Sequence, residues 1–162
     1  MLVSLLAITV TTLIAHPVTF DKIINDYISL KNSLVKDNGD SARNSSKILF
    51  YDLQEFKVDE LTAVQKKVWN QFAEKISYDA EHIKGTSELE HQREHFVTLS
   101  ANMFKLLKGL SMNSIKLYHQ FCPMANDGKG AYWLSEKEEI SNPYMGKKMP
   151  KCGSTKDSLN VK

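Results

Sequence analysis

The feature that most constrains this chain is a repeated apolar spacing of three and four residues between Phe20 and Leu110. Such spacing places the apolar side chains on one face of an α-helix. Turn-forming residues divide the pattern into four segments, at about 20–34, 40–56, 60–83 and 89–110. Because short connections between helices of similar length favour antiparallel neighbours, the sequence predicts an up-and-down bundle of about four helices.

The periodicity changes after Gly109. Ile115, Leu117, His119 and Phe121 alternate with polar residues, and this period of two indicates a strand. A turn-rich loop separates it from a second short strand candidate at 131–134. We therefore expect a mainly α protein with a small C-terminal β-hairpin and loop lobe. The predicted domain covers residues 16–153, and residues 154–162 are expected to form a frayed polar tail.

Length and charge limit the functional classes. The chain has 162 residues, which suits a single domain, and its 21 basic and 19 acidic residues give a net charge of only +2. This balance argues against a nucleic-acid partner. We see no glycine-rich phosphate loop and no residues that sequence alone identifies as a catalytic triad. The sequence therefore predicts a protein that is not an enzyme and that uses no organic cofactor.

The first residues predict export. The segment 2–15 is uncharged and apolar, too short to span a bilayer but of the length found in signal peptides. Ala15 is a small residue suited to the cleavage site, whereas no Lys or Arg precedes the run as such signals usually require. A buried N-terminal strand or helix is the alternative. We expect a signal peptide at 1–15 and no stable membrane span after processing.

Soft donor atoms gather near the C-terminus. Cys122-Pro123-Met124 and Met149-Pro150-Lys151-Cys152 each combine a thiol with a thioether. These donors favour Cu(I), Ag(I) and similar soft ions. In an oxidising compartment the cysteines could instead form a disulfide, worth about 3–4 kcal/mol for a loop of this size, with the methionines as packing. The residue pattern alone leaves both interpretations open.

Several blocks of sequence resemble a domain family of unknown function. That family occurs in envelope proteins of Gram-negative bacteria and at the end of periplasmic adaptor subunits of copper and silver efflux pumps. The similarity covers most of the chain from Val18 onward. The residues that carry it are His82-Ile83, Gln92-Arg93-Glu94-His95-Phe96-Val97-Thr98-Leu99-Ser100, Phe121-Cys122-Pro123-Met124-Ala125, Gly130-Ala131-Tyr132-Trp133-Leu134-Ser135, Ile140-Ser141-Asn142-Pro143-Tyr144-Met145-Gly146, Met149 and Cys152-Gly153.

The resemblance implies a helical periplasmic domain with a heavy-metal role. It favours the metal interpretation, with Cys122, Met124, Met149 and Cys152 as ligands of Cu(I) or Ag(I). His119, His95, His82 and Met145 are further candidates, although Met145 stands where the family often has a tyrosine. The implied partners are the metal ion and an efflux adaptor or other envelope protein. The alternative function is an interaction module stabilised by a Cys122–Cys152 disulfide.

One further motif has a different interpretation. His91-Gln92-Arg93-Glu94-His95 matches the His-x-x-Glu-His pattern of inverted zinc peptidases, in which two histidines one helical turn apart share a metal. Such an enzyme also needs a distant carboxylate ligand and a substrate cleft. We therefore interpret these residues as solvated or capping histidines and do not predict a peptidase.

Overall fold

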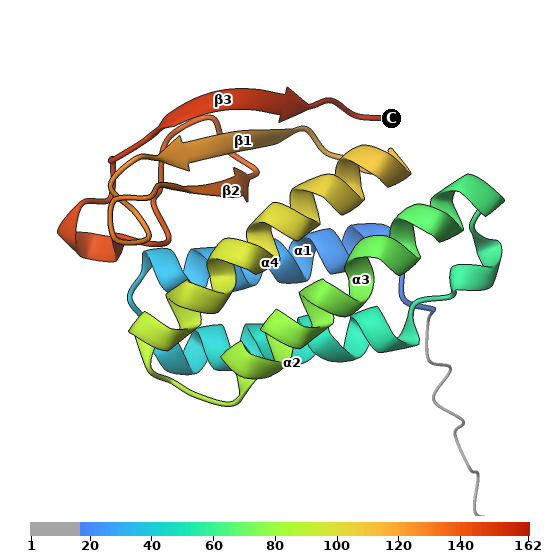
Figure 1. Ribbon diagram of the computed structural model, residues 1–162, viewed down its shortest axis with the longest axis horizontal. Helices are drawn as coiled ribbons and strands as arrows, with labels where there is room; N and C mark the ends of the chain where they lie inside the picture. The colour runs from blue at the N-terminus through green and yellow to red at the C-terminus, as the bar shows by residue number, and fades with distance from the viewer. Residues whose placement is uncertain (1–16) are drawn as a thin grey trace, which may run out of the picture.

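The structure, a computed structural model, describes residues 17–162. It contains four long helices: α1 (Phe20–Val35), α2 (Gly39–Glu55), α3 (Ala63–Lys84) and α4 (Leu89–Leu110). The predicted signal peptide at 1–15 lies outside the described residues. Consecutive helices pack side by side, as the short connections predicted (Figure 1). The predicted helical bundle with a C-terminal β element is confirmed.

Local chemistry sets the helix ends. The Thr19 hydroxyl accepts the backbone N–H of Lys22 at the start of α1, at 3.2 Å. Thr62 and Gln65 form a reciprocal capping box at the start of α3, immediately after the short 3-10 helix η1 (Val58–Glu60). By contrast, Glu88 precedes α4 without a side-chain capping hydrogen bond.

The C-terminal lobe, residues 115–162, contains an antiparallel sheet. Strand β1 (Leu117–Cys122) is central, with β2 (Ala131–Ser135) on one side and β3 (Ser154–Leu159) on the other. The 3-10 helix η2 (Gly146–Lys148) lies in the connection from β2 to β3. The predicted hairpin is therefore present, but the expectation of a frayed tail from residue 154 is wrong. The polar side chains of residues 154–159 gave no strand pattern. Backbone pairing with β1 nevertheless orders this segment as β3.

Helix α1 anchors the lobe to the bundle. The Lys31 ammonium is buried and lies 2.8 Å from a Glu136 oxygen just beyond β2, and Asn32 donates a second hydrogen bond to that carboxylate. One turn away, the Tyr27 hydroxyl accepts the backbone N–H of Leu134 at 3.0 Å. Since a buried charge is costly without a partner, these contacts set the position of β2 on the bundle.

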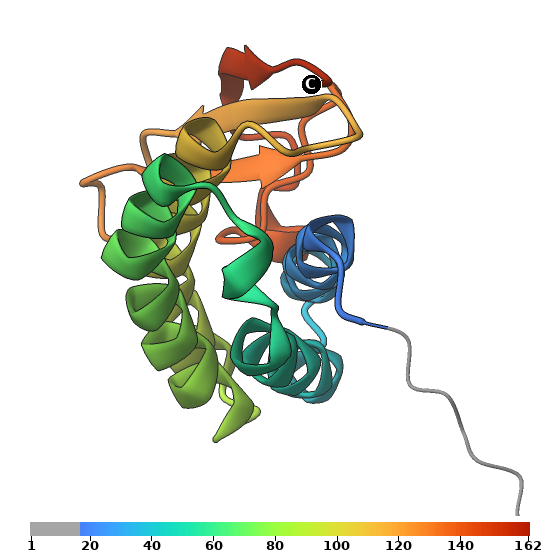
Figure 2. The ribbon, with the colours of Figure 1, turned by 90° about the vertical axis from the view of Figure 1, so that its right-hand side faces the viewer.

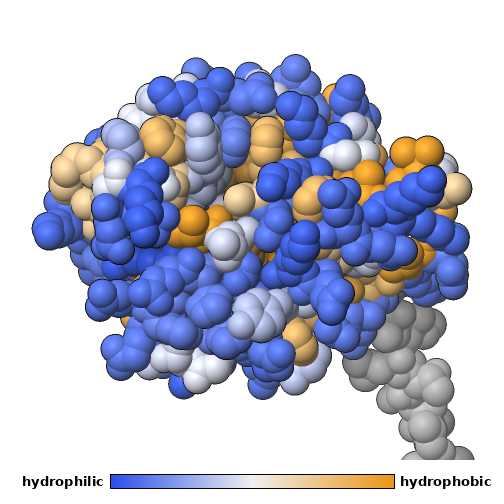
Figure 3. Space-filling view, in the orientation of Figure 1, coloured by the Kyte–Doolittle hydropathy of each residue, from blue (hydrophilic) through white to orange (hydrophobic). Residues whose placement is uncertain are grey.

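The lobe lies across one side of the bundle, next to α1 and α4 (Figures 1 and 2). Figure 3 shows that the face of the molecule seen in Figure 1 is mainly hydrophilic, with apolar atoms exposed in a hollow between the lobe and the helices. Within the described part of the chain, no helix is both long and apolar enough to cross a membrane.

The backbone at Gly153 yields a stability prediction. Its φ of +135° is a conformation that only glycine adopts readily, and an added Cβ would lie 2.8 Å from the Phe121 carbonyl oxygen and 2.9 Å from the Trp133 ring. We expect Gly153→Ala to lower the free energy of unfolding by about 3 kcal/mol, measured by urea denaturation.

The control is Gly128→Ala. Gly128 also has a positive φ, +78°, but an added Cβ there meets open space. Backbone strain alone then predicts that Gly128→Ala lowers the free energy of unfolding by about 1 kcal/mol. Equal losses for the two variants would show that the close approach of residue 153 to β1 does not matter.

Candidate functional site

The structure brings the two cysteines together. Cys122 ends the central strand β1 and is fully buried, whereas Cys152 lies in the turn after η2 and is half-buried. Their Sγ atoms are 2.8 Å apart although 30 residues separate them in sequence. The pair can therefore act as one chemical unit, as both the metal and the disulfide interpretations require.

Asn142 organises the loop that carries Cys152. Its buried side chain donates to the Cys152 carbonyl oxygen at 2.7 Å and accepts the backbone N–H groups of Tyr144 and Met145 at 2.8 and 3.0 Å. Its own backbone N–H donates to the Pro150 carbonyl oxygen. One amide thus joins both ends of the loop, which explains why the Asn-Pro-Tyr block accompanies the second cysteine.

The surroundings of Cys152 favour the neutral form of its thiol. The contact with the Cys122 thiol raises the pKa of Cys152, and burial adds to this effect, while a hydrogen bond from the Met124 backbone opposes it. A thiol with a raised pKa is a poor nucleophile and a poor ligand until a metal ion displaces its proton. Metal uptake at this pair would therefore release protons.

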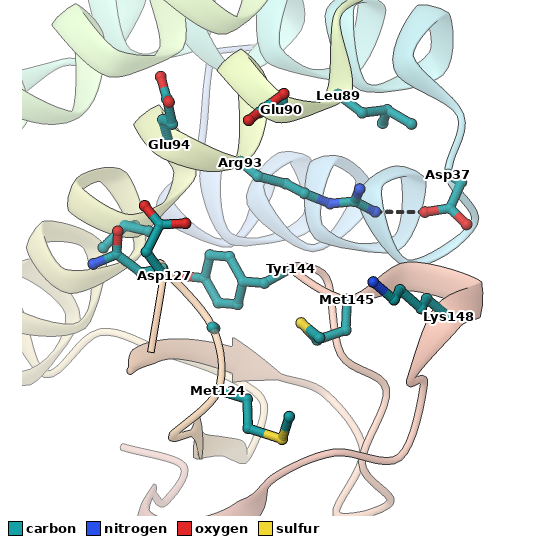
Figure 4. A pocket seen from close by; sticks show the side chains of 13 residues that line it. Asp37, Leu89, Glu90, Arg93, Glu94, Met124, Asp127, Tyr144, Met145 and Lys148 are labelled. Carbon is teal, nitrogen blue, oxygen red and sulfur yellow. Dashed lines mark hydrogen bonds and ion pairs between the residues drawn. The ribbon is translucent and has the colours of Figure 1, made fainter. Parts of the chain in front are cut away.

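The methionines do not all lie together. Met124 and Met145 line a cavity of about 620 Å³ between α4 and the lobe, and Met124 is 53% exposed (Figure 4). Met149 is half-buried and is not among the described residues that line this cavity. Its carbonyl oxygen accepts the Cys152 backbone N–H at 3.2 Å. Met145 thus lines the same cavity as Met124, whereas the Met149 backbone stabilises the turn at Cys152.

The predicted histidine ligands lie elsewhere. The regular pairing of β1 with β2 places His119 and Cys122, three residues apart, on opposite faces of the sheet. The His119 ring stacks between Phe104 and Tyr132, with centroid distances of 3.7 and 4.6 Å. Burial lowers the pKa of His119. His119 therefore acts as an aromatic packing residue, and its predicted place beside the cysteines is not what the structure shows.

His82 and His95 also lie apart from the cysteine pair. They project from α3 and α4, where the structure groups them with His91. The ligand nitrogens of the three histidines lie within 4.8 Å of one another. Sequence reasoning noted His91 and His95 at a spacing of one helical turn but missed His82 as their neighbour, because only the packing of α3 on α4 brings it there.

An ion pair closes one side of the cavity. The Arg93 guanidinium contacts the Asp37 carboxylate and donates to the carbonyl oxygens of Pro143 and Leu34 at 2.8 and 3.0 Å (Figure 4). Asp37 also accepts the backbone N–H of Lys147 at 2.9 Å. Burial works to raise the pKa of Asp37, but the Lys147 amide and the Arg93 guanidinium together hold it below its usual value. Together these contacts join the start of α4 and the α1–α2 turn to the loop around η2.

The fold and site define a class of protein: a four-helix bundle with a three-stranded lobe that holds a thiol pair, and a cavity lined in part by two thioethers between the lobe and α4. A family model described as a protein of unknown function (DUF3347) matches residues 23–114, which is more than half of the chain, and the chain belongs to this family. The match begins in the first turn of α1, runs through the end of α4 and stops before the cysteines. No curated protein matches the chain, and no solved structure does.

The Asp37 contacts predict a pH-dependent stability. Because the pKa of Asp37 is lower in the folded than in the unfolded state, its stabilisation is present above the ordinary carboxyl pKa and is lost as the pH falls through the folded value. Asp37→Asn suits the positive φ of this residue, 54°. We expect it to cost about 1 kcal/mol at pH 7 and progressively less below pH 4, measured by denaturation across pH.

Asp59→Asn is the matched control, because Asp59 is a fully exposed carboxylate 3.7 Å from Lys66. It should change stability much less at pH 7. A pH-independent effect of Asp37→Asn would contradict the role assigned to the Asp37 charge.

Proposed function

We propose that this chain is a non-catalytic, soft-metal-binding protein of the cell envelope that works in copper or silver homeostasis or efflux. The observation that carries the proposal is the meeting of Cys122 and Cys152, with Sγ atoms 2.8 Å apart. Met124, two residues after Cys122, lines a cavity and adds a thioether close to the pair in sequence. Thiolates and thioethers are the donors that Cu(I) and Ag(I) prefer.

The pair must open to take an ion. With metal–sulfur bonds of about 2.3 Å, two thiolates on one ion stand roughly 4 Å apart, farther than the reduced pair in this structure. Cys122 is fixed in the central strand, whereas Cys152 lies in a turn with room on its solvent side. We therefore infer that Cys152 moves and that the Cys122 sulfur is the fixed ligand.

The Met124 side chain is the best placed third donor. Met124 follows Cys122 by two residues, and its backbone contacts the Cys152 sulfur. Its 53% exposure leaves it free to turn toward an ion held by the two sulfurs. Met149 remains a proposed ligand of the same site through its position in the Cys152 turn.

Envelope localisation and the link to efflux rest on the apolar leader at 2–15 and on the resemblance of the Cys-Pro-Met and Asn-Pro-Tyr blocks to efflux-adaptor domains. In such a compartment a protein that captures Cu(I) needs no catalysis, since deprotonated thiols supply the affinity. An efflux adaptor or another envelope protein is the proposed recipient of the ion.

Copper titration tests this proposal. Reduced protein titrated with Cu(I) without oxygen, against a coloured Cu(I) chelator, should bind one equivalent at the cysteine pair. Cys122→Ser with Cys152→Ser should abolish this binding, because both thiolates are lost. Met124→Leu should weaken it about tenfold, equivalent to one lost donor bond of about 1.4 kcal/mol.

Met112→Leu is the control for the thioether. Met112 is also partly exposed, at 36%, but it lies between α4 and β1, outside the loop of the cysteines. It should leave Cu(I) affinity unchanged. If the double serine variant binds Cu(I) as tightly as the parent, the proposal is wrong.

The same 2.8 Å separation favours a second candidate function, an interaction module whose lobe is fastened by a Cys122–Cys152 disulfide. Counting free thiols by mass spectrometry, after alkylation of protein taken directly from its compartment, separates the two. Two alkylated thiols are expected for the metal-binding protein. A fully oxidised pair that resists reduction would favour the module, and reduction should then cost about 3–4 kcal/mol of stability.

A further inference from the structure

We propose that His82, His91 and His95 form a second metal site, separate from the cysteines and suited to a borderline divalent ion such as Cu²⁺ or Zn²⁺. Their ligand nitrogens all lie within 4.8 Å of one another. The His82 and His95 rings stack with centroids 4.3 Å apart, and the His91 ring lies 4.8 Å from that of His95. A single ion bound to all three nitrogens needs only small side-chain movements from this arrangement.

The two helices supply a rigid frame for the site. His82 lies in the last turn of α3, whereas His91 and His95 stand one turn apart near the start of α4. The connection between these helices, residues 85–88, is short, and α3 and α4 pack along their length. Ligands placed on packed helices are held more accurately than ligands on loops, so the site is largely preformed.

Asp79 orients one of the ligands. Its buried carboxylate lies 3.0 Å from Nδ1 of His95 and accepts a hydrogen bond from the Thr98 hydroxyl at 2.7 Å. A carboxylate on one ring nitrogen keeps the proton there and leaves Nε2 with its lone pair free for a metal. This arrangement of carboxylate, histidine and open nitrogen is the usual outer support of histidine–metal sites.

The site has an accessible side. His82 and His91 line a surface hollow of about 440 Å³ together with Glu81, Gly85 and Thr86. His91 is exposed, so an ion can enter directly from solvent. Three imidazoles leave a coordination position for water or for a donor from another molecule. Glu94, with an oxygen 3.8 Å from Nδ1 of His91, adds negative charge next to the cation.

The donor atoms determine the class of ion. Imidazole nitrogens suit Cu²⁺, Zn²⁺ and Ni²⁺, whereas Cu(I) and Ag(I) prefer the sulfur atoms of the C-terminal lobe. This inference therefore extends the proposed function and does not depend on it. Loss of the cysteines should leave the histidine site intact, and loss of the histidines should leave Cu(I) binding intact.

Copper(II) is the probe for the experiment. The full chain with Cys122→Ser and Cys152→Ser, which cannot reduce Cu²⁺ through these thiols, should bind one equivalent in the presence of a competing amino acid. Its electron paramagnetic resonance spectrum should show coupling to nitrogen. His91→Ala should weaken binding at least tenfold, and because this side chain is exposed, the variant should fold normally.

Asp79→Asn tests the positioning residue. It should weaken Cu²⁺ binding by about 10- to 100-fold without removing a ligand, so the nitrogen coupling should persist at saturating metal. His119→Phe is the matched control, because it removes a histidine from an aromatic stack in the lobe. It should leave the Cu²⁺ affinity unchanged.

Two results would overturn the inference. One is the absence of stoichiometric Cu²⁺ binding by the folded chain with Cys122→Ser and Cys152→Ser. The other is binding that persists unchanged when His91 and His95 are both replaced by Ala, which would place the ion elsewhere. Far-ultraviolet circular dichroism of each variant separates loss of ligands from loss of fold.

Discussion

The buried ammonium of Lys31 is the constraint on which the position of the lobe depends. A charge in this environment requires a partner, and the structure provides one from a segment 105 residues away, the Glu136 carboxylate. Burial lowers the pKa of Lys31 even in the presence of Glu136. A shift of the lobe would separate the Glu136 carboxylate from the Lys31 ammonium and leave an unpaired charge inside the protein. The free-energy cost of that charge is far above the cost of breaking an exposed ion pair.

The lobe then follows from this anchor. Glu136 fixes the end of β2, β2 fixes β1 by a regular antiparallel register, and β1 carries Cys122 into the interior. The return of the chain past Gly153, close to the Phe121 carbonyl, brings Cys152 to the same point. The ion pair is a side-chain contact, and the strand pairing that follows is a ladder of backbone hydrogen bonds. The meeting of the two sulfurs is therefore a consequence of how the lobe docks on α1.

The sequence predicted most of the bundle because helix periodicity is local. Phe96, Leu99 and Met103 repeat at three and four residues, and all are fully buried in α4. Strand β3 was not predicted because it lacks such a local pattern. Ser154–Leu159 has no buried apolar side, so its order comes from pairing with β1. The closeness of His82 to His95 could not be predicted either, because it depends on the packing of α3 on α4.

The candidate site shows the same division between local and tertiary information. Residue chemistry identified Cys122 and Cys152 as a pair, with metal and disulfide left open, and their 2.8 Å separation agrees with the pairing itself. Strand alternation placed His119 beside Phe121 but did not reveal its stacking partner Phe104 on α4. The Asp37–Arg93 contact had no sequence signal, because its partners come from a turn and from a helix in the middle of the chain.

Sulfur and nitrogen donors at separate places give the two proposed sites different sensitivity to oxidation. Conversion of the Cys122 and Cys152 thiols to a disulfide removes the ligands that favour Cu(I) but leaves the imidazoles of α3 and α4 unchanged. On the two proposals, oxidising conditions therefore close the Cu(I) site and preserve the Cu²⁺ site. Copper itself changes oxidation state in the same direction, so a chain with both donor sets retains a ligand set suited to the ion under either condition.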